Sequence, residues 1–263
     1  MDLGLLDRVA IVSASSEGLG RAAALDLARE GARLALCART DKTLQTAAQE
    51  IRQQTGADVF ARTCDVSDPD QIDGFVAKVA EHYDERIDIL VNNAGGPPPG
   101  TIAEVGLREW RIAFDRTFAS VVRFCQQVVP YMQRRKWGRI ITITSSSTRQ
   151  PIDGLATSNA MRPAIVGFAK TLSRELAPHN ILVNNVAPGM FRTARHEELL
   201  ESMATSQNRS PEEILQERVA QVPLGRMGDP DEHAHMITFL ASERASYITG
   251  QTIAVDGGLV RGL

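Results

Sequence analysis

The chain has 263 residues, of which 43% are hydrophobic, and a formal net charge of −3, a composition that suits one large α/β domain and gives no reason to expect nucleic acid as a partner. No apolar run approaches the roughly 20 residues of a membrane-spanning helix, and the first residues lack the basic and apolar stretches of a leader. The three cysteines are too far apart for a CxxC metal or redox pair, so we expect a cytoplasmic protein with reduced thiols and no metal.

The first predicted elements are a strand and a helix joined by a turn of small residues. An apolar run from Val9 leads into an alanine-rich helical pattern that we expect to cover residues 18–30. Backbone N–H groups are free at a helix N-terminus, and Gly18 and Gly20 have no Cβ to keep a pyrophosphate away. The spacing departs from the dinucleotide fingerprint G-x-G-x-x-G, because Ala14 stands at its first small position. The turn is interpreted as a dinucleotide site, with an ordinary βα connection as the alternative.

The second predicted strand, residues 33–37, bears on the choice between NAD and NADP. An acidic residue after this strand would accept hydrogen bonds from the ribose of NAD, but the chain has Ala38 and Arg39. A guanidinium there suits the 2′-phosphate of NADP, which Glu17 would repel unless it pairs with Arg39. We therefore expect NADP to be preferred over NAD, with a solvated loop arginine as the alternative reading.

A polar helix over residues 41–54 and a strand over residues 58–63 follow. Asp65, after that strand, is placed to accept a hydrogen bond from an adenine amino group, or else to begin a turn. Asp68 and Pro69 have the pattern of an N-cap and first helical residue, and their helix extends to Tyr83.

The fourth predicted strand, residues 87–91, is apolar enough to be buried on both faces. Residues 92–96 then allow the backbone to close on a cofactor, because they are small or are asparagines. The three prolines at 97–99 form a stiff, extended rim.

At this point the chain resembles a known family. The residues that carry the resemblance are 13–20, Asp65, 92–95, 183–189, Thr193 and 256–258. They have the order and spacing of the short-chain dehydrogenases/reductases, in particular of those similar to 3-oxoacyl-acyl-carrier-protein reductase. The resemblance extends from about residue 6 to residue 258. It implies a single α/β domain of the Rossmann type, with a doubly wound, seven-stranded parallel sheet and helices on both faces.

The resemblance also implies which residues bind the dinucleotide, whose nicotinamide would lie at the carboxyl ends of the strands. The expected cofactor residues are Ser13, Ser15, Ser16, Gly18, Leu19, Gly20, Arg39, Asp65, Val66, Asn93, Ala94, Gly95, Arg162, Pro188, Gly189 and Thr193.

Two positions of the family's catalytic set fall before residue 150. The helix predicted over residues 107–136 carries Thr117, where the family usually has an asparagine that holds a proton-relay water. A threonine hydroxyl binds water but lacks the paired donor and acceptor of an amide. The strand over residues 138–145 ends at Ser145, the position of the substrate-orienting serine, and Ser146 and Ser147 are its neighbours.

The family's tyrosine and lysine are both replaced. Their positions, thirteen residues after the serine and four further on, hold Ser158 and Arg162. An aliphatic hydroxyl is a much weaker acid than a phenol, and a guanidinium with a pKa above about 12 is a poor proton donor. We therefore expect an intact cofactor site beside an acid–base site that has been rebuilt or lost, with Ser145, Ser158, Arg162 and Thr117 as the catalytic candidates.

Other proton donors are conceivable within the same stretch. They are Ser145, or a water polarised by Arg162, together with Asp153 and His196, each with a pocket-lining or surface role as the alternative. Pro163 leaves the carbonyl of Asn159 without a helical donor, which predicts either a binding point for water or ligand or a simple bend.

The segment of residues 190–226 is polar and helical and is interpreted as a substrate lid, with an N-cap and proline at Ser210 and Pro211. Its cationic candidates favour an anionic substrate, unless they belong to a solvated helix face; they are Arg192, Arg195, His196 and Arg209. A helix over residues 230–241 and a strand over residues 250–255 complete the pattern.

The leading hypothesis is an NAD(P)(H)-dependent oxidoreductase that transfers hydride between nicotinamide and a carbonyl or secondary alcohol, with a 3-oxoacyl, sugar or ketone-like substrate and a non-standard proton donor. The alternatives are a cofactor-binding protein with little or no turnover, acting as a sensor or partner subunit, and a reductase of C=C bonds. Wide apolar stripes on the helix over 107–136 and on the helix after Pro163, together with the resemblance, predict a homodimer or homotetramer.

Overall fold

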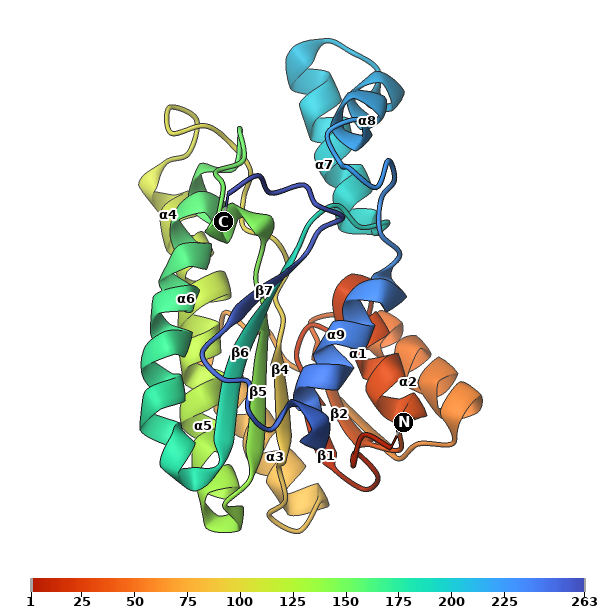
Figure 1. The fold of residues 1–263 in the computed structure, drawn as a ribbon, viewed down its shortest axis with the longest axis vertical. Coiled ribbons are helices and arrows are strands. Elements are labelled where there is room, and N and C mark those ends of the chain that lie inside the picture. Colours follow the sequence, from red (N-terminus) through yellow and green to blue (C-terminus); the bar gives the residue numbers. More distant parts are fainter. Residues whose placement is uncertain (1, 263) are drawn as a thin grey trace.

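The computed structural model describes residues 2–262, and within them seven parallel strands form one sheet (Figure 1). The strands are β1 (Val9–Val12), β2 (Arg33–Ala38), β3 (Val59–Thr63), β4 (Ile89–Asn92), β5 (Gly138–Ile143), β6 (Ile181–Pro188) and β7 (Thr252–Val255). The main helices are α1 (Gly18–Arg29), α2 (Asp41–Thr55), α3 (Pro69–His82), α4 (Leu107–Ala113), α5 (Ser120–Arg135), α6 (Ala156–Leu176), α7 (Ala194–Gln207), α8 (Pro211–Val219) and α9 (Pro230–Ala241).

The strand order is β3-β2-β1-β4-β5-β6-β7, and each neighbouring pair is parallel. The chain winds outward from β1 to β3 and then returns to place β4 on the other side of β1. The connections after β1 and β4 therefore diverge at the carboxyl ends of adjacent strands, which is the crevice where doubly wound sheets bind ligands. This topology confirms the predicted fold class.

Alternate residues of each strand enter two separate cores. In β1, Ala10 and Val12 pack under α1, α2 and α9, whereas Val9 and Ile11 pack under α3, α5 and α6 (Figure 1). Both faces of the sheet are thus covered, which is why the strands read as continuous apolar runs. The three cysteines are buried and unpaired, as predicted for reduced thiols. Across residues 2–262, none of the helices combines the length and the apolar character needed to cross a bilayer.

The predicted helix starts agree with the structure where a capping residue is present. The Asp68 side chain accepts from the backbone N–H groups of Asp70 and Gln71, and Pro69 is the first residue of α3. These bonds satisfy donors that have no partner inside the helix.

The helix predicted over residues 107–136 is not regular throughout. Between α4 and α5 lies a π-helical turn, η1 (Phe114–Ala119), which places one extra residue in the turn. Arg116 and Thr117 lie in η1, and Thr117 is buried. The extra residue changes which side chains face the edge of the sheet. Hydrophobic periodicity in the sequence does not reveal this π-helical turn.

The segment predicted as a lid forms α7 and α8, which stand beyond the carboxyl ends of the strands, apart from both sheet cores (Figure 1). Leu200, Ala204 and Ile214 bury one another in a small core of their own. At the base of this segment, Phe191 packs edge-on against the buried His233 ring of α9.

Candidate active site

The turn between β1 and α1 is held by side chains that bond to the backbone. The hydroxyl of Ser13 donates to the carbonyl of Asn93 at 2.7 Å and accepts from the Asn93 backbone N–H at 2.8 Å. The hydroxyl of Ser15 donates to the Val12 carbonyl at 2.9 Å. Both serines are fully buried, so these two predicted cofactor residues fix the path of the turn through these bonds.

Two glycines are required by the path of this turn. Gly18 has a φ of +58°, in the left-handed region. A β-carbon at Gly20 would lie 2.5 Å from Asn93 Nδ2 and 2.7 Å from the Ala14 carbonyl oxygen. The same Asn93 amide donates to that carbonyl at 2.9 Å and ties the turn to the end of β4. Any side chain at Gly20 would separate the two loops that flank the crevice.

The remaining predicted cofactor residues gather at the same edge of the sheet. Ser16 and Leu19 lie half-buried at the start of α1, and Val66 is buried after β3. Ala94 and Gly95 follow β4, while Pro188 ends β6 and Gly189 comes directly after it. Thr193 caps α7 by accepting from the His196 N–H, and its methyl group would lie 3.7 Å from a β-carbon on Gly18. The start of the lid segment therefore lies over the β1–α1 turn.

A cationic group lies at the other end of the crevice, near the ends of β2 and β3. Asp65 Oδ1 accepts from the Ser67 backbone and hydroxyl at 2.9 and 2.7 Å, so Asp65 begins a turn, which was the alternative reading. Burial raises the pKa of Asp65, but those bonds and the charges of Arg39 and Arg116 outweigh it and lower the pKa overall. Glu17 is exposed and, within the described part of the chain, makes no ion pair with Arg39.

Arg116 is a member of this group that the sequence reasoning missed. It lies half-buried in η1, and burial, followed by the charge of Arg39, lowers its pKa. Among the described side chains neither Arg39 nor Arg116 has an ion-pair partner within 4.0 Å, although Asp65 is near enough to act on both electrostatically. The sequence signal for this role was a basic residue directly before Thr117. The direction in which the Arg116 side chain points, however, depends on the π-helical turn η1.

Three serines converge at the end of β5. The hydroxyls of Ser147 and Ser158 are 3.2 Å apart, and the Ser147 backbone N–H donates to the Ser145 hydroxyl at 3.1 Å. Ser147 and Ser158 are buried, and Ser145 is half-buried. The structure thus brings Ser158 into contact with Ser147, which the sequence reasoning considered only as a neighbour of Ser145. The contact joins η2 (Ser146–Thr148) to the first turn of α6.

Arg162 lies one helical turn after Ser158 and is 7% exposed. It donates to the Ile143 carbonyl, at the end of β5, at 2.7 Å, while its Nε has no hydrogen-bond partner in the described structure. Burial and, to a lesser extent, the charge of Arg195 lower the pKa of Arg162 to about 10. The group therefore remains a cation at neutral pH. Thr117, also buried, has a hydroxyl oxygen without a partner among the described atoms.

The other proposed proton donors lie elsewhere. Asp153 is exposed on the loop before α6. His196, on α7, has a pKa lowered to about 4 by burial and by the charge of Arg218, so it is neutral at pH 7 and has no acidic proton to give. Pro163 is accommodated inside α6, which continues through it to Leu176.

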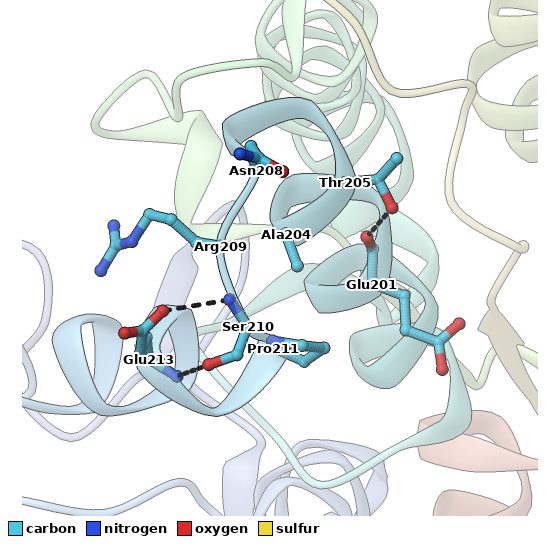
Figure 2. A pocket seen from close by; sticks show the side chains of 8 residues that line it. All are labelled: Glu201, Ala204, Thr205, Asn208, Arg209, Ser210, Pro211 and Glu213. Atoms are coloured by element: carbon cyan, nitrogen blue, oxygen red, sulfur yellow. Dashed lines mark hydrogen bonds between the residues drawn. The ribbon is translucent and has the colours of Figure 1, made fainter.

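A separate hollow of about 690 Å³ lies at the turn between α7 and α8 (Figure 2). This turn is at the opposite end of α7 from Thr193. Its polar groups bond to one another. Ser210 and Glu213 form a reciprocal capping box, and the Thr205 hydroxyl donates to the Glu201 carbonyl (Figure 2). The hollow belongs to the lid's own architecture and not to the crevice.

Comparison with known proteins agrees with this geometry. The family model described as enoyl-(acyl carrier protein) reductase matches residues 13–260. A putative ketoacyl reductase of Streptomyces coelicolor is 36% identical over 253 residues, covering 95% of this chain and 96% of that protein. The 3-oxoacyl-acyl-carrier-protein reductase of Thermotoga maritima is 34% identical over 253 residues, covering 96% and 98%.

A solved structure shares the whole fold. The L-sorbose reductase of Gluconobacter frateurii, complexed with NADPH and L-sorbose, superposes with a TM-score of 0.94 at 33% identity and covers 100% of both chains. The strand order, the crevice beside β1 and β4 and these alignments over nearly the full length lead to one conclusion: the chain belongs to the short-chain dehydrogenase/reductase family.

Proposed function

We propose that this protein is an NADP(H)-dependent oxidoreductase that interconverts a carbonyl and a secondary alcohol through a serine and arginine site. The observation that carries the proposal is the contact of the Ser147 and Ser158 hydroxyls next to Ser145, at the carboxyl end of β5, where the buried Arg162 guanidinium donates to the Ile143 carbonyl. This cluster lies at the same edge of the sheet as the β1–α1 turn. Hydroxyl donors and a cation suit a reaction that develops negative charge on oxygen.

In this proposal a nicotinamide dinucleotide lies along the carboxyl ends of the strands. The β1–α1 turn and the N-terminus of α1 would hold the pyrophosphate, and Arg39 with Arg116 would hold the 2′-phosphate at the far end. Ala94, Gly95 and Pro188 would line the path between them, and residues 190–226 would serve as the lid. NADPH is present in the L-sorbose reductase structure, which supports NADP over NAD.

The bound nicotinamide supplies or accepts the hydride. In the reducing direction, the hydroxyls of Ser145 and Ser158 donate hydrogen bonds to the carbonyl oxygen and Arg162 stabilises the charge that forms there. The alkoxide that results is about as basic as a serine alkoxide, so a proton from Ser158 passes to it without a large free-energy cost. Ser147, hydrogen-bonded to Ser158, then returns a proton to that oxygen, and Ser147 takes a proton from solvent water as the product leaves, so that each reduction consumes one solvent proton.

The relatives support a carbonyl substrate. Those reported above are named as ketoacyl and L-sorbose reductases. A first test measures NADPH and NADH binding by fluorescence and then NADPH oxidation with 3-oxoacyl, sugar and cyclic ketone substrates. We expect submicromolar to micromolar NADPH binding and turnover with at least one of these classes.

A second test concerns the donor. Ser158→Ala is expected to lower kcat by about 100-fold, in the lower part of the range for general acid catalysis. Ser173→Ala removes another buried serine of α6, whose hydroxyl bonds only within the helix, and serves as the matched control. An unchanged kcat in Ser158→Ala would remove this residue from the mechanism.

Two other functions remain as second candidates. The replacement of both acid–base residues favours a cofactor-binding protein with little or no turnover, a sensor or partner subunit, and tight NADPH binding without turnover would identify it. The description of the matching family model as an enoyl reductase favours reduction of an activated C=C bond. Oxidation of NADPH by enoyl substrates but not by ketones would identify that activity.

We also propose a homodimer or homotetramer that uses the outer face of α4, η1 and α6. Leu107 and Phe114 are exposed there, and Phe114, Phe118 and Phe168 form a continuous series of ring contacts. Light scattering of the eluted protein is expected to give a mass above one chain, and Phe114→Glu is expected to lower it. Tyr247→Glu, at a fully exposed aromatic residue elsewhere on the surface, is the control.

A further inference from the structure

The chain between β4 and α4 is hydrogen-bonded to two different elements. Its three consecutive prolines, residues 97–99, are here called the proline rim. Arg195 Nη2, from the first turn of α7, donates to the Pro97 carbonyl at 3.1 Å. Thr157 Oγ1, from the first turn of α6, donates to the Pro98 carbonyl at 2.7 Å. Two adjacent carbonyls of one short segment therefore join the lid to the helix that carries Ser158.

The first turn of α6 is held in place by the rim and by the residue that follows it. No side chain caps the N-terminus of this helix. The Ala156 N–H, which has no acceptor inside α6, donates to the Gly100 carbonyl at 3.1 Å, and the Gly100 N–H donates to the Gly154 carbonyl at 2.6 Å. Thr157 is fully buried and directly precedes Ser158. The backbone that carries the Ser158 hydroxyl is thus tied to the rim by a side chain and by the main chain.

On the lid side, the Arg195 guanidinium lies against the backbone that leads into the rim. Its Nε would lie 2.7 Å from a β-carbon on Gly96, so a side chain at that position would push the guanidinium away. The other partner of Arg195 is Glu198, at 3.2 Å, which lies in the same helix. Of these two partners, it is therefore Pro97 that ties α7 to the rim.

Two other cations predicted for the lid are paired away from the rim. Arg209 pairs with Glu217 of α8 at 2.6 Å, and Arg192 pairs with Asp229, directly before α9, at 2.7 Å. Arg192 therefore provides a matched comparison for Arg195, because it is an exposed lid arginine only three residues away with a partner on another element.

The proline rim is suited to transmit a displacement between these two contacts. The pyrrolidine ring fixes φ at each of its residues, so the carbonyls of Pro97 and Pro98 have little freedom to move independently. Consecutive prolines form a semi-rigid, extended segment. Loss of the lid contact at Pro97 therefore loosens the segment that Thr157 binds, and such a coupling acts equally in both directions.

We propose that the proline rim couples closure of the lid to the placement of the Ser158 hydroxyl. In this inference Thr157 is a positioning residue that acts through Ser158, and Arg195 is the residue through which the closed lid holds the rim. The inference rests on the proposed function, in which Ser158 is the proton donor. It adds a physical reason for the reaction to be faster under a closed lid.

Kinetics of the full chain test the α6 side of this coupling. Thr157→Val keeps the shape of the side chain but removes the donor to Pro98, and it is expected to lower kcat about tenfold with the best ketone, because the Ser158 hydroxyl loses its alignment. The KM for NADPH should stay unchanged. Thr157→Ser keeps the hydroxyl and should restore most of kcat. Thr171→Val removes a hydroxyl that bonds to the Gly167 carbonyl within the same helix, and it is the matched control.

Amide hydrogen exchange tests the lid side and requires no turnover. The Ala156 N–H reports the contact of α6 with Gly100, and it is expected to exchange about fivefold faster in Arg195→Met, as one hydrogen bond to the rim is lost. Arg195 is exposed, so this variant does not depend on how well the buried Thr157 tolerates substitution. Arg192→Met is the control and should leave the exchange of Ala156 unchanged.

The outcomes separate the inference from the proposed function. A wild-type kcat in Thr157→Val, or a kcat in Thr157→Ser as low as in Thr157→Val, would overturn the role of the Thr157 hydroxyl in positioning Ser158. Equal exchange of Ala156 in Arg195→Met and the wild type would overturn the coupling to the lid. A wild type that binds no NADPH or turns over no ketone would instead overturn the proposed function, and the exchange of Ala156 would still decide whether the lid and α6 are coupled.

Discussion

On the cofactor side of the crevice the side chains of Ser13, Ser15 and Asn93 bond to the backbone, whereas on the reaction side two buried polar atoms of the described structure have no partner. Ser13 and Asn93 illustrate the first arrangement, and Thr117 Oγ1 and Arg162 Nε the second. The cofactor side depends on close backbone approach, which few residues allow. The reaction side depends on side-chain chemistry, which two substitutions are enough to change. In the function proposed above, the fold would therefore keep its cofactor crevice while its acid–base groups are replaced.

The largest effect is expected from a single methyl group on the cofactor side. Gly20→Ala would force Asn93 and the Ala14 carbonyl apart and is expected to weaken NADPH binding by about 100-fold, the loss of a few kcal/mol of contacts. Gly74→Ala, in α3, meets nothing within 4 Å and should leave binding unchanged while slightly raising the thermal midpoint. Fluorescence titration measures the NADPH affinity of the two variants, and thermal unfolding measures their midpoints. Normal NADPH affinity in Gly20→Ala would show that this turn does not hold the cofactor.

On the reaction side, loss of the cation should affect activity and stability in opposite directions. Arg162→Met is expected to lower kcat by about 100-fold, because charge on the substrate oxygen loses its stabilisation. The same change should raise the free energy of unfolding by about 1 kcal/mol, because an unpaired buried cation disappears.

Arg139 provides the matched contrast, because it is equally buried but bonds to the carbonyls of Gly138, Asn180 and Ser242. Arg139→Met should lower the free energy of unfolding by about 2 kcal/mol, since its hydrogen bonds to those carbonyls are lost. Denaturant titration compares the two variants. A destabilised Arg162→Met would mean that Arg162 serves the fold.

At the far end of the cofactor side, Arg39→Ala and Arg116→Ala are each expected to reduce the preference for NADPH over NADH by about tenfold, as one contact to a phosphate is lost. The effect should shrink as salt is added. Arg111→Ala, on the exposed face of α4, is the control. Unchanged ratios of NADPH to NADH affinity in Arg116→Ala would assign Arg116 a structural role.

The smallest effect is expected at the base of the α7–α8 segment, which belongs to neither the cofactor side nor the reaction side of the crevice. Burial lowers the pKa of His233 to about 3 from its usual 6.5. The unfolded chain therefore takes up this proton first, so the stability that His233 contributes falls as the pH drops from 6.5 toward 3. At pH 5.5 the loss should be about 1 kcal/mol. Thermal unfolding of the wild type and of His233→Met at pH 7.5 and 5.5 measures this loss of stability. An equal pH dependence of stability in the two proteins would contradict the lowered pKa of His233.

Sequence patterns predicted the parts of the molecule that local chemistry determines. The Asp68 cap, the glycines of the β1–α1 turn and the apolar strands are examples. They did not predict Arg116, because its direction depends on the extra residue of η1, nor Ser147, because its contact with Ser158 depends on how η2 packs on α6. Nor did they predict the backbone bonds of Ser13 and Ser15, although a serine beside a turn bonds readily to nearby backbone.

The separate core of α7 and α8 has a consequence for kinetics. Because Leu200, Ala204 and Ile214 already bury one another, the segment keeps its internal structure at any angle to the sheet. Closing it over a bound molecule requires rotation at its two connections to β6 and α9, and little ordering of new backbone. Association should therefore be fast, and the residence time of the bound molecule should depend mainly on how firmly the few contacts at the rim hold the segment down.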